Sequence, residues 1–149
     1  MKTFKYILTF IIFVSATLVS GQDKYCLYQN SAIKAYQDAD FVRAKTLIDT
    51  AIALCPDLDK DPYTWHIKGF ICKDLYFKTE KNNIHSPSRD LAVEAFTKSF
   101  ELDSTNEYIE NNKKAIKKLA GTYSNNAAVL LDTNNYGKAI TLYGKYKAI

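Results

Sequence analysis

Apolar residues recur at three- and four-residue spacing through most of the chain after Tyr25, which predicts amphipathic helices rather than strands. Residues 41–54, 90–102 and 136–149 each show one broad apolar face. In each of them a small residue is followed four positions later by a large one; the pairs are Ala44 and Ile48, Ala92 and Phe96, and Ala139 and Tyr143. An earlier helical segment precedes each, at residues 28–39, 63–77 and 123–131. The pattern predicts helical hairpins that repeat along the chain.

The first segment of each predicted hairpin has a signature of its own, an aromatic residue followed four positions later by a small one. The pairs are Tyr28 and Ala32, Trp65 and Gly69, and Tyr123 and Ala127. The small residue lets a neighbouring helix approach, and the aromatic ring fills the space between hairpins. The two signatures resemble those of the tetratricopeptide repeat family over residues 25–149. Lys68 and Cys72 depart from the Leu and Tyr that are usual there.

The resemblance implies an all-α fold of helical hairpins stacked as a right-handed α-solenoid. The repeats would span about residues 25–58, 61–104 and 105–149, the last one incomplete. An unrelated helical bundle is the alternative. Ala92 follows Ala44 by 48 residues and Ala139 follows Ala92 by 47, both more than the family period of about 34. We assign the first excess to a polar loop inserted at residues 79–89 and the second to one long helix from about Asn106 to Asp132.

Residues 1–21 predict a secretory signal peptide, which leaves residues 22–149 as the repeat domain. Lys2 and Lys5 precede an apolar run, and Val19, Ser20 and Gly21 supply small residues at the expected cleavage point. An uncleaved anchor and a buried core helix are the alternatives, although the run is short of the roughly 20 apolar residues that span a bilayer. We therefore expect an exported protein of the periplasm, the cell envelope or the extracellular space. Membrane association is expected only through a partner or an uncleaved signal.

Charge and motifs narrow the function classes. The formal charge of +4 falls to +2 without Lys2 and Lys5, which disfavours a nucleic-acid-binding protein. The one dense basic cluster is Lys113, Lys114, Lys117 and Lys118. Its lysines are expected on the solvated face of a helix, with phosphate or anionic-lipid contact as the alternative. No phosphate loop, nucleophile elbow or pair of metal-spaced histidines occurs, so we predict neither an enzyme nor a cofactor.

The three cysteines fit no usual zinc pattern together with His66, so no metal site is predicted. An exported chain encounters oxidising conditions. Cys26 begins the first predicted helix and Cys55 ends the second, and antiparallel helices bring those ends together. A Cys26–Cys55 disulfide is one interpretation, and buried free thiols are the other. Cys72 is expected to stay unpaired.

By resemblance, function lies on the concave surface that the first helices build, where a peptide or partner helix binds. The matching positions are Gln29, Ile33, Tyr36, Tyr63, His66, Phe70 and Lys73, followed by Ser124, Ala128 and Leu131. The Lys, Asn and Arg residues with which some family members hold a peptide C-terminus are missing from these positions. Residues 136–149 keep apolar positions that nothing covers, which favours a fragment of a longer protein or self-association through this helix.

These observations favour a non-catalytic protein-interaction module, a scaffold of the cell envelope whose partner is another protein or a peptide. The alternative function is the N-terminal scaffold of a larger cell-surface protein that captures ligands such as glycans. Tyr63, Trp65 and Phe70 would then stack on sugar rings, although Trp65 also suits packing between hairpins.

Overall fold

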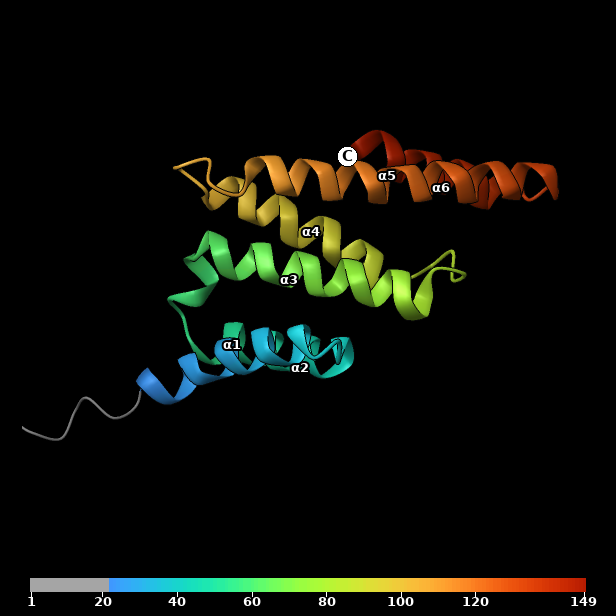
Figure 1. Ribbon diagram of the computed structural model, residues 1–149. Coiled ribbons are helices and arrows are strands. Elements are labelled where there is room, and N and C mark those ends of the chain that lie inside the picture. The colour runs from blue at the N-terminus through green and yellow to red at the C-terminus, as the bar shows by residue number, and fades with distance from the viewer. Residues whose placement is uncertain (1–21) are drawn as a thin grey trace, which may run out of the picture.

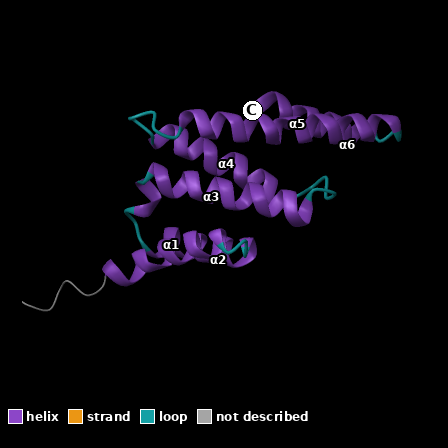
Figure 2. Ribbon diagram, in the orientation of Figure 1, coloured by secondary structure: helices purple, strands orange, loops and turns teal. Residues whose placement is uncertain are grey.

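The computed structural model describes residues 22–149, with side chains from residue 27 onward, so the predicted signal peptide lies outside it. The described chain is helical, with no strand in it, which confirms the predicted all-α class (Figure 2). Its elements are α1 (Gln22–Gln37), α2 (Phe41–Leu54), the 3₁₀ turn η1 (Leu58–Lys60), α3 (Pro62–Leu75), the π-helical turn η2 (Tyr76–Glu80), α4 (Pro87–Leu102), α5 (Ile109–Asp132) and α6 (Tyr136–Ala148). None of these helices is long and apolar enough to cross a bilayer.

The helices pair in chain order, α1 with α2, α3 with α4, and α5 with α6. Figure 1 shows the three pairs as three successive levels, with α3 and α4 in the middle. Helix α3 contacts α1 and α2 on one side and α5 on the other, in addition to its own partner α4. The middle hairpin therefore joins the two outer ones.

Short polar side chains start α2, α3 and α4, and the cap of α4 is Ser86. Asp40 accepts a hydrogen bond from the Arg43 backbone N–H at 3.2 Å and begins α2. Asp61 accepts from the N–H groups of Tyr63 and Thr64, and Pro62 occupies the first helical position of α3. Both aspartates thus satisfy backbone N–H groups that the first turn of a helix leaves without a partner.

The turns within the first and third hairpins have the same geometry. Ala39 and Asn134 both adopt φ of 59°, in the left-handed region. The N–H of the following residue reaches back five positions in each turn, from Asp40 to Ala35 O and from Asn135 to Leu130 O. Such left-handed residues end helices and reverse the chain. The sequence repeat is thus matched by a repeat in backbone conformation.

Two predicted boundaries are wrong. The loop expected at residues 79–89 comprises only residues 81–86, because η2 carries the helical path to Glu80 and Ser86 caps α4. Glu80 draws these ends together, since its carboxylate accepts from the hydroxyl groups of Ser86 and Ser88 at 2.6 and 2.7 Å.

The long helix α5 ends at Asp132 as predicted but begins at Ile109 rather than near Asn106. Asp103 holds residues 103–108 in a turn by accepting from the N–H groups of Glu107 and Tyr108. Asn106 adopts a positive φ of 62°, which an α-helix does not accommodate.

The core is divided among the hairpins and the interfaces between them. One cluster joins α1 and α2 to Ile71 of α3. Another joins Cys72 and Phe96 of the middle hairpin to Ala115 and Leu119 of α5. A third fills the last hairpin, whose α6 is also tied to α4 by an ion pair between Lys145 and Asp90.

Candidate functional site

Polar side chains link α1 to α3 and α3 to α5, so the three first helices lie side by side. The Gln29 amide donates to Thr64 Oγ1 at 2.7 Å, and the Tyr36 hydroxyl donates to Asp74 Oδ2 at 2.6 Å, which joins α1 to α3. The His66 ring lies 2.7 Å from Asn112 Oδ1, which joins α3 to α5. We call the surface of these three helices the α1–α3–α5 face.

Four aromatic side chains gather where α3 meets the start of α5: Tyr63, His66, Phe70 and Tyr108, called here the ring cluster. The His66 ring centroid lies 4.7 Å from that of Tyr108 and 4.9 Å from that of Phe70. Tyr63 lies 5.8 Å from Tyr108, so the rings are in contact across α3 and the start of α5. All four side chains are half-buried, which leaves part of each ring accessible.

A chain of hydrogen bonds fixes the position of His66. Its Nδ1–H donates to Asn112 Oδ1, because the amide oxygen can only accept. The Asn112 amide donates to Ser99 Oγ at 3.0 Å, and the Ser99 hydroxyl donates to the carbonyl oxygen of Pro62 at 2.9 Å. Asn112 and Ser99 are fully buried, so α3, α4 and α5 are held together by satisfied polar groups.

The rings themselves are uncharged, and the carboxylates of Asp103 and Glu107 lie close enough to His66 to act on its pKa. Burial lowers the pKa of His66 and outweighs the opposing hydrogen bond with Asn112, so the ring is uncharged near pH 7. Burial also raises the pKa of Tyr36, with help from its hydrogen bond to Asp74. Lys73 lies 4.8 Å from the Phe70 ring centroid, and its charge is paired with Asp74 at 2.6 Å. Such a surface suits aromatic and hydrogen-bonding groups of a ligand.

The structure places the residues of the predicted binding groove in different environments. Tyr63, His66, Phe70 and Lys73 lie together on α3, whereas Gln29 and Tyr36 use their polar groups to bind α3 and Ile33 is half-buried. On α5, Ser124 is half-buried, and Ala128 and Leu131 are exposed. Sequence reasoning missed Tyr108 and Asn112. Tyr108 falls in the segment assigned to linking helix, and nothing in the pattern marks Asn112 as a buried contact of His66.

A second polar centre lies around Arg89, which is only 1% exposed. Its guanidinium carbon lies 3.9 Å from the ring centroid of Tyr123 and 5.3 Å from that of Tyr76. One guanidinium nitrogen donates to the carbonyl oxygen of Ile84 at 2.6 Å, and the other lies 3.4 Å from Thr122 Oγ1. Arg89 therefore fastens the loop before α4 and the start of α4 to α5.

The cysteines add no site among the described residues. Cys72 is fully buried, and burial raises the pKa of its thiol to about 11. Cys55 is buried beside Ala51 and Leu58. The side chain of Cys26 lies outside the described residues, so the Cys26–Cys55 disulfide remains a prediction. From residue 27 to 149, no three His, Cys, Asp or Glu side chains gather as metal ligands would.

No family model, no curated protein and no solved structure matches this chain.

Proposed function

We propose that this chain is a non-catalytic, protein-binding scaffold of the tetratricopeptide type. Its three hairpins form a right-handed α-solenoid, and a peptide or helix of another protein binds to the α1–α3–α5 face. Residues 1–21 direct the chain to the periplasm or cell envelope.

The observation that carries the proposal is the ring cluster where α3 meets the start of α5. Tyr63, His66, Phe70 and Tyr108 are half-buried and in contact with one another, and His66 is hydrogen-bonded to Asn112. Rigid aromatic side chains lose little conformational entropy on binding and are enriched at the energetic centres of protein interfaces. The uncharged rings favour an aromatic peptide segment, and the carboxylates of Asp103 and Glu107 near His66 disfavour an acidic one.

The repeat geometry supports the solenoid. The turns at Ala39 and Asn134 share one conformation, and the aromatic–small pattern of Trp65 and Gly69 gives the close approach of α4 that the family resemblance implies. In stacked repeats each unit buries its apolar face against the next. The glycan-capture alternative gains no support from Trp65, which is 9% exposed and donates to the carbonyl oxygen of Asp59.

Selection from a random peptide library displayed on phage tests the proposal. The immobilised protein should enrich peptides with aromatic residues, and these peptides should bind about tenfold more weakly to the Tyr63→Ala and Phe70→Ala variants. Fluorescence anisotropy with the enriched peptides gives the dissociation constants.

Tyr136→Ala is the matched control, because Tyr136 is an exposed tyrosine on α6, away from the ring cluster. It should leave the dissociation constants unchanged. Thermal unfolding of all variants separates loss of binding from loss of fold. A library that yields no enriched sequence, or binders indifferent to both α3 variants, contradicts the proposal.

A further inference from the structure

Lysine or arginine side chains lie over five aromatic rings of the described chain, those of Trp65, Phe70, Tyr76, Phe77 and Tyr123. A cation over the face of a ring is attracted by the negative charge of the π-system. Among the described residues no lysine or arginine lies over the ring of Tyr63 or Tyr108. These two members of the ring cluster therefore lack the kind of partner that other rings of this chain have.

Three carboxylates lie beside the same two rings. Asp61 accepts from the backbone N–H of Tyr63 at 3.2 Å, and Asp103 accepts from that of Tyr108 at 2.8 Å. Glu107 directly precedes Tyr108 and is exposed. None of the three carboxylates makes an ion pair among the described residues. The negative charge beside the tyrosine rings thus has no ion-pair partner within the described chain.

The electric field of these carboxylates reaches the ring cluster. Burial raises the pKa of Tyr108 to about 12, with help from Glu107 and Asp61. Burial lowers the pKa of His66, and the carboxylates of Asp103 and Glu107 act in the opposite direction. A cation placed on these rings would lie in the same negative field and be stabilised by it.

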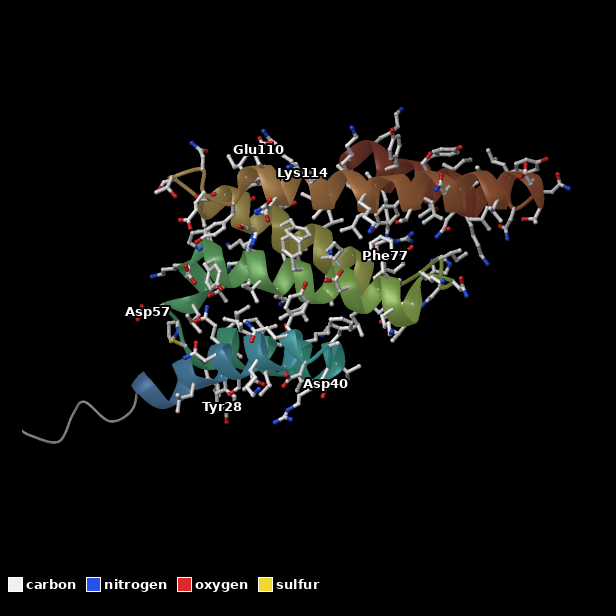
Figure 3. All side chains as sticks on the ribbon, viewed as in Figure 1. Tyr28, Asp40, Asp57, Phe77, Glu110 and Lys114 are labelled. Atoms are coloured by element: carbon white, nitrogen blue, oxygen red, sulfur yellow. The ribbon has the colours of Figure 1, made fainter. Side chains whose placement is uncertain are left out.

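The lysines of α3 and α5 leave this charge unmatched. Lys73 is held in an ion pair of 2.6 Å within α3. Lys114 follows Asn112 by two residues and so lies on the opposite side of α5, where Figure 3 shows it pointing outward. Lys118 lies 4.4 Å from the ring centroid of Phe77, further along α5. A cation that matches the carboxylates must therefore come from a bound partner.

An arginine of the partner suits both the rings and the carboxylates. Its planar guanidinium group stacks on aromatic faces and binds a carboxylate through two parallel N–H groups, whereas the ammonium group of lysine is compact and more strongly hydrated. Glu107 is the best-placed acceptor, because Asp61 and Asp103 already accept from backbone N–H groups.

We propose that an arginine of the bound segment lies on the rings of Tyr63 and Tyr108, with its guanidinium group on the carboxylate of Glu107. Resting on the proposed function, this assignment names the partner of the same site, an aromatic segment that carries an arginine. Along α3 the carboxylates lie at the Tyr63 end of the ring cluster and Lys73 lies beyond its other end. The arginine therefore also sets the direction in which the segment lies.

Two phage-displayed peptide libraries of equal length test the assignment. Both encode the same aromatic and small residues; one adds arginine and has no acidic residue, and the other adds glutamate and has no basic residue. The immobilised protein should enrich aromatic peptides from the arginine library only, because the carboxylates beside the rings repel glutamate.

The enriched peptides are then made with citrulline, which is neutral and nearly identical to arginine in shape. Fluorescence anisotropy should show the citrulline peptides binding about tenfold more weakly. The Glu107→Gln variant should bind the arginine peptides about threefold more weakly and the citrulline peptides unchanged. Glu94→Gln is the matched control and should leave both affinities unchanged, because Glu94 is an exposed glutamate of α4 that lines a separate hollow beside Trp65.

The outcomes separate this assignment from the proposed function. Aromatic peptides enriched from the glutamate library, or citrulline peptides that bind as tightly as their arginine forms, overturn the assignment and leave the proposed function standing. An equal effect of Glu107→Gln on arginine and citrulline peptides overturns it too, because Glu107 would then act without regard to the charge of the ligand. Enrichment from neither library contradicts the proposed function and the assignment with it.

Discussion

Gly69 makes room for the ring of Phe96 between α3 and α4. A β-carbon at Gly69 would lie 2.5 Å from Cε1 of Phe96, closer than real atoms approach. Phe96 is fully buried and meets Phe70 edge-on at 5.2 Å between centroids, so its ring has little freedom to move. The absence of a side chain at this one position therefore decides how the middle hairpin closes.

Replacement of Gly69 by Ala should lower the free energy of unfolding by about 1–3 kcal/mol, because the overpacked ring must shift. At an exposed position inside a helix, replacement of glycine by alanine raises the free energy of unfolding by up to about 1 kcal/mol. A β-carbon at Gly144 of α6 would meet no other side chain within 4 Å, so Gly144 provides that comparison. Urea denaturation should give opposite signs for Gly69→Ala and Gly144→Ala; the same sign for both would show that Phe96 does not restrict the site.

Single residues also show what the sequence allowed one to predict. The aromatic–small pattern predicted a close helix approach after Trp65, and the Gly69–Phe96 geometry confirms it. The polar loop predicted at residues 79–89 included Arg89, whereas the structure buries this side chain. A hydrophobicity pattern assigns every arginine to a solvent-exposed position. The burial of Arg89 depends on Tyr76 and Tyr123, which reach it from two other elements.

At the scale of an element, the start of α4 depends on long-range contacts as well as on its own cap. Ser86 supplies the cap by accepting from the Arg89 N–H at 3.1 Å. The Arg89 side chain then binds Ile84 O and lies against Tyr123 of α5. Local signals predicted the helix but not its first residues, since Glu80 and Arg89 act through partners that no spacing rule connects.

The Arg89→Met variant should lose about 2–4 kcal/mol of stability, because the carbonyl group of Ile84 loses its donor and two tyrosine rings lose the cation. Arg43→Met is the control at an exposed arginine and should change stability by less than about 0.5 kcal/mol. Equal effects of the two substitutions in urea denaturation would contradict the role given to Arg89.

At the scale of the whole molecule, the stacking of the hairpins couples stability to the protonation of His66. This ring lies at the boundary between the second and third hairpins and contacts Asn112 and Tyr108 of the third. Burial lowers its pKa in the folded chain, whereas the unfolded chain takes up the proton near pH 6.5. The unfolded state thus binds more protons as the pH falls through that value.

We expect the stability contribution of neutral His66 to be complete above about pH 6.5 and to be lost as the pH falls below it. Urea denaturation at a series of pH values from about 7.5 downward gives the free energy of unfolding. It should fall more steeply with decreasing pH for the wild type than for His66→Gln. Equal slopes, or a wild type that gains stability on acidification, would argue against a buried neutral ring.

The order of the three levels also determines how the described chain would carry mechanical load. The outer hairpins are held to the middle one, by α1 and α2 on one side of α3 and by α5 on the other. A pull between a partner on one outer hairpin and a partner on the other would thus pass through the middle hairpin in series. The interfaces marked by Tyr36–Asp74 and His66–Asn112 would carry that force, because they lie on the path between the two outer hairpins.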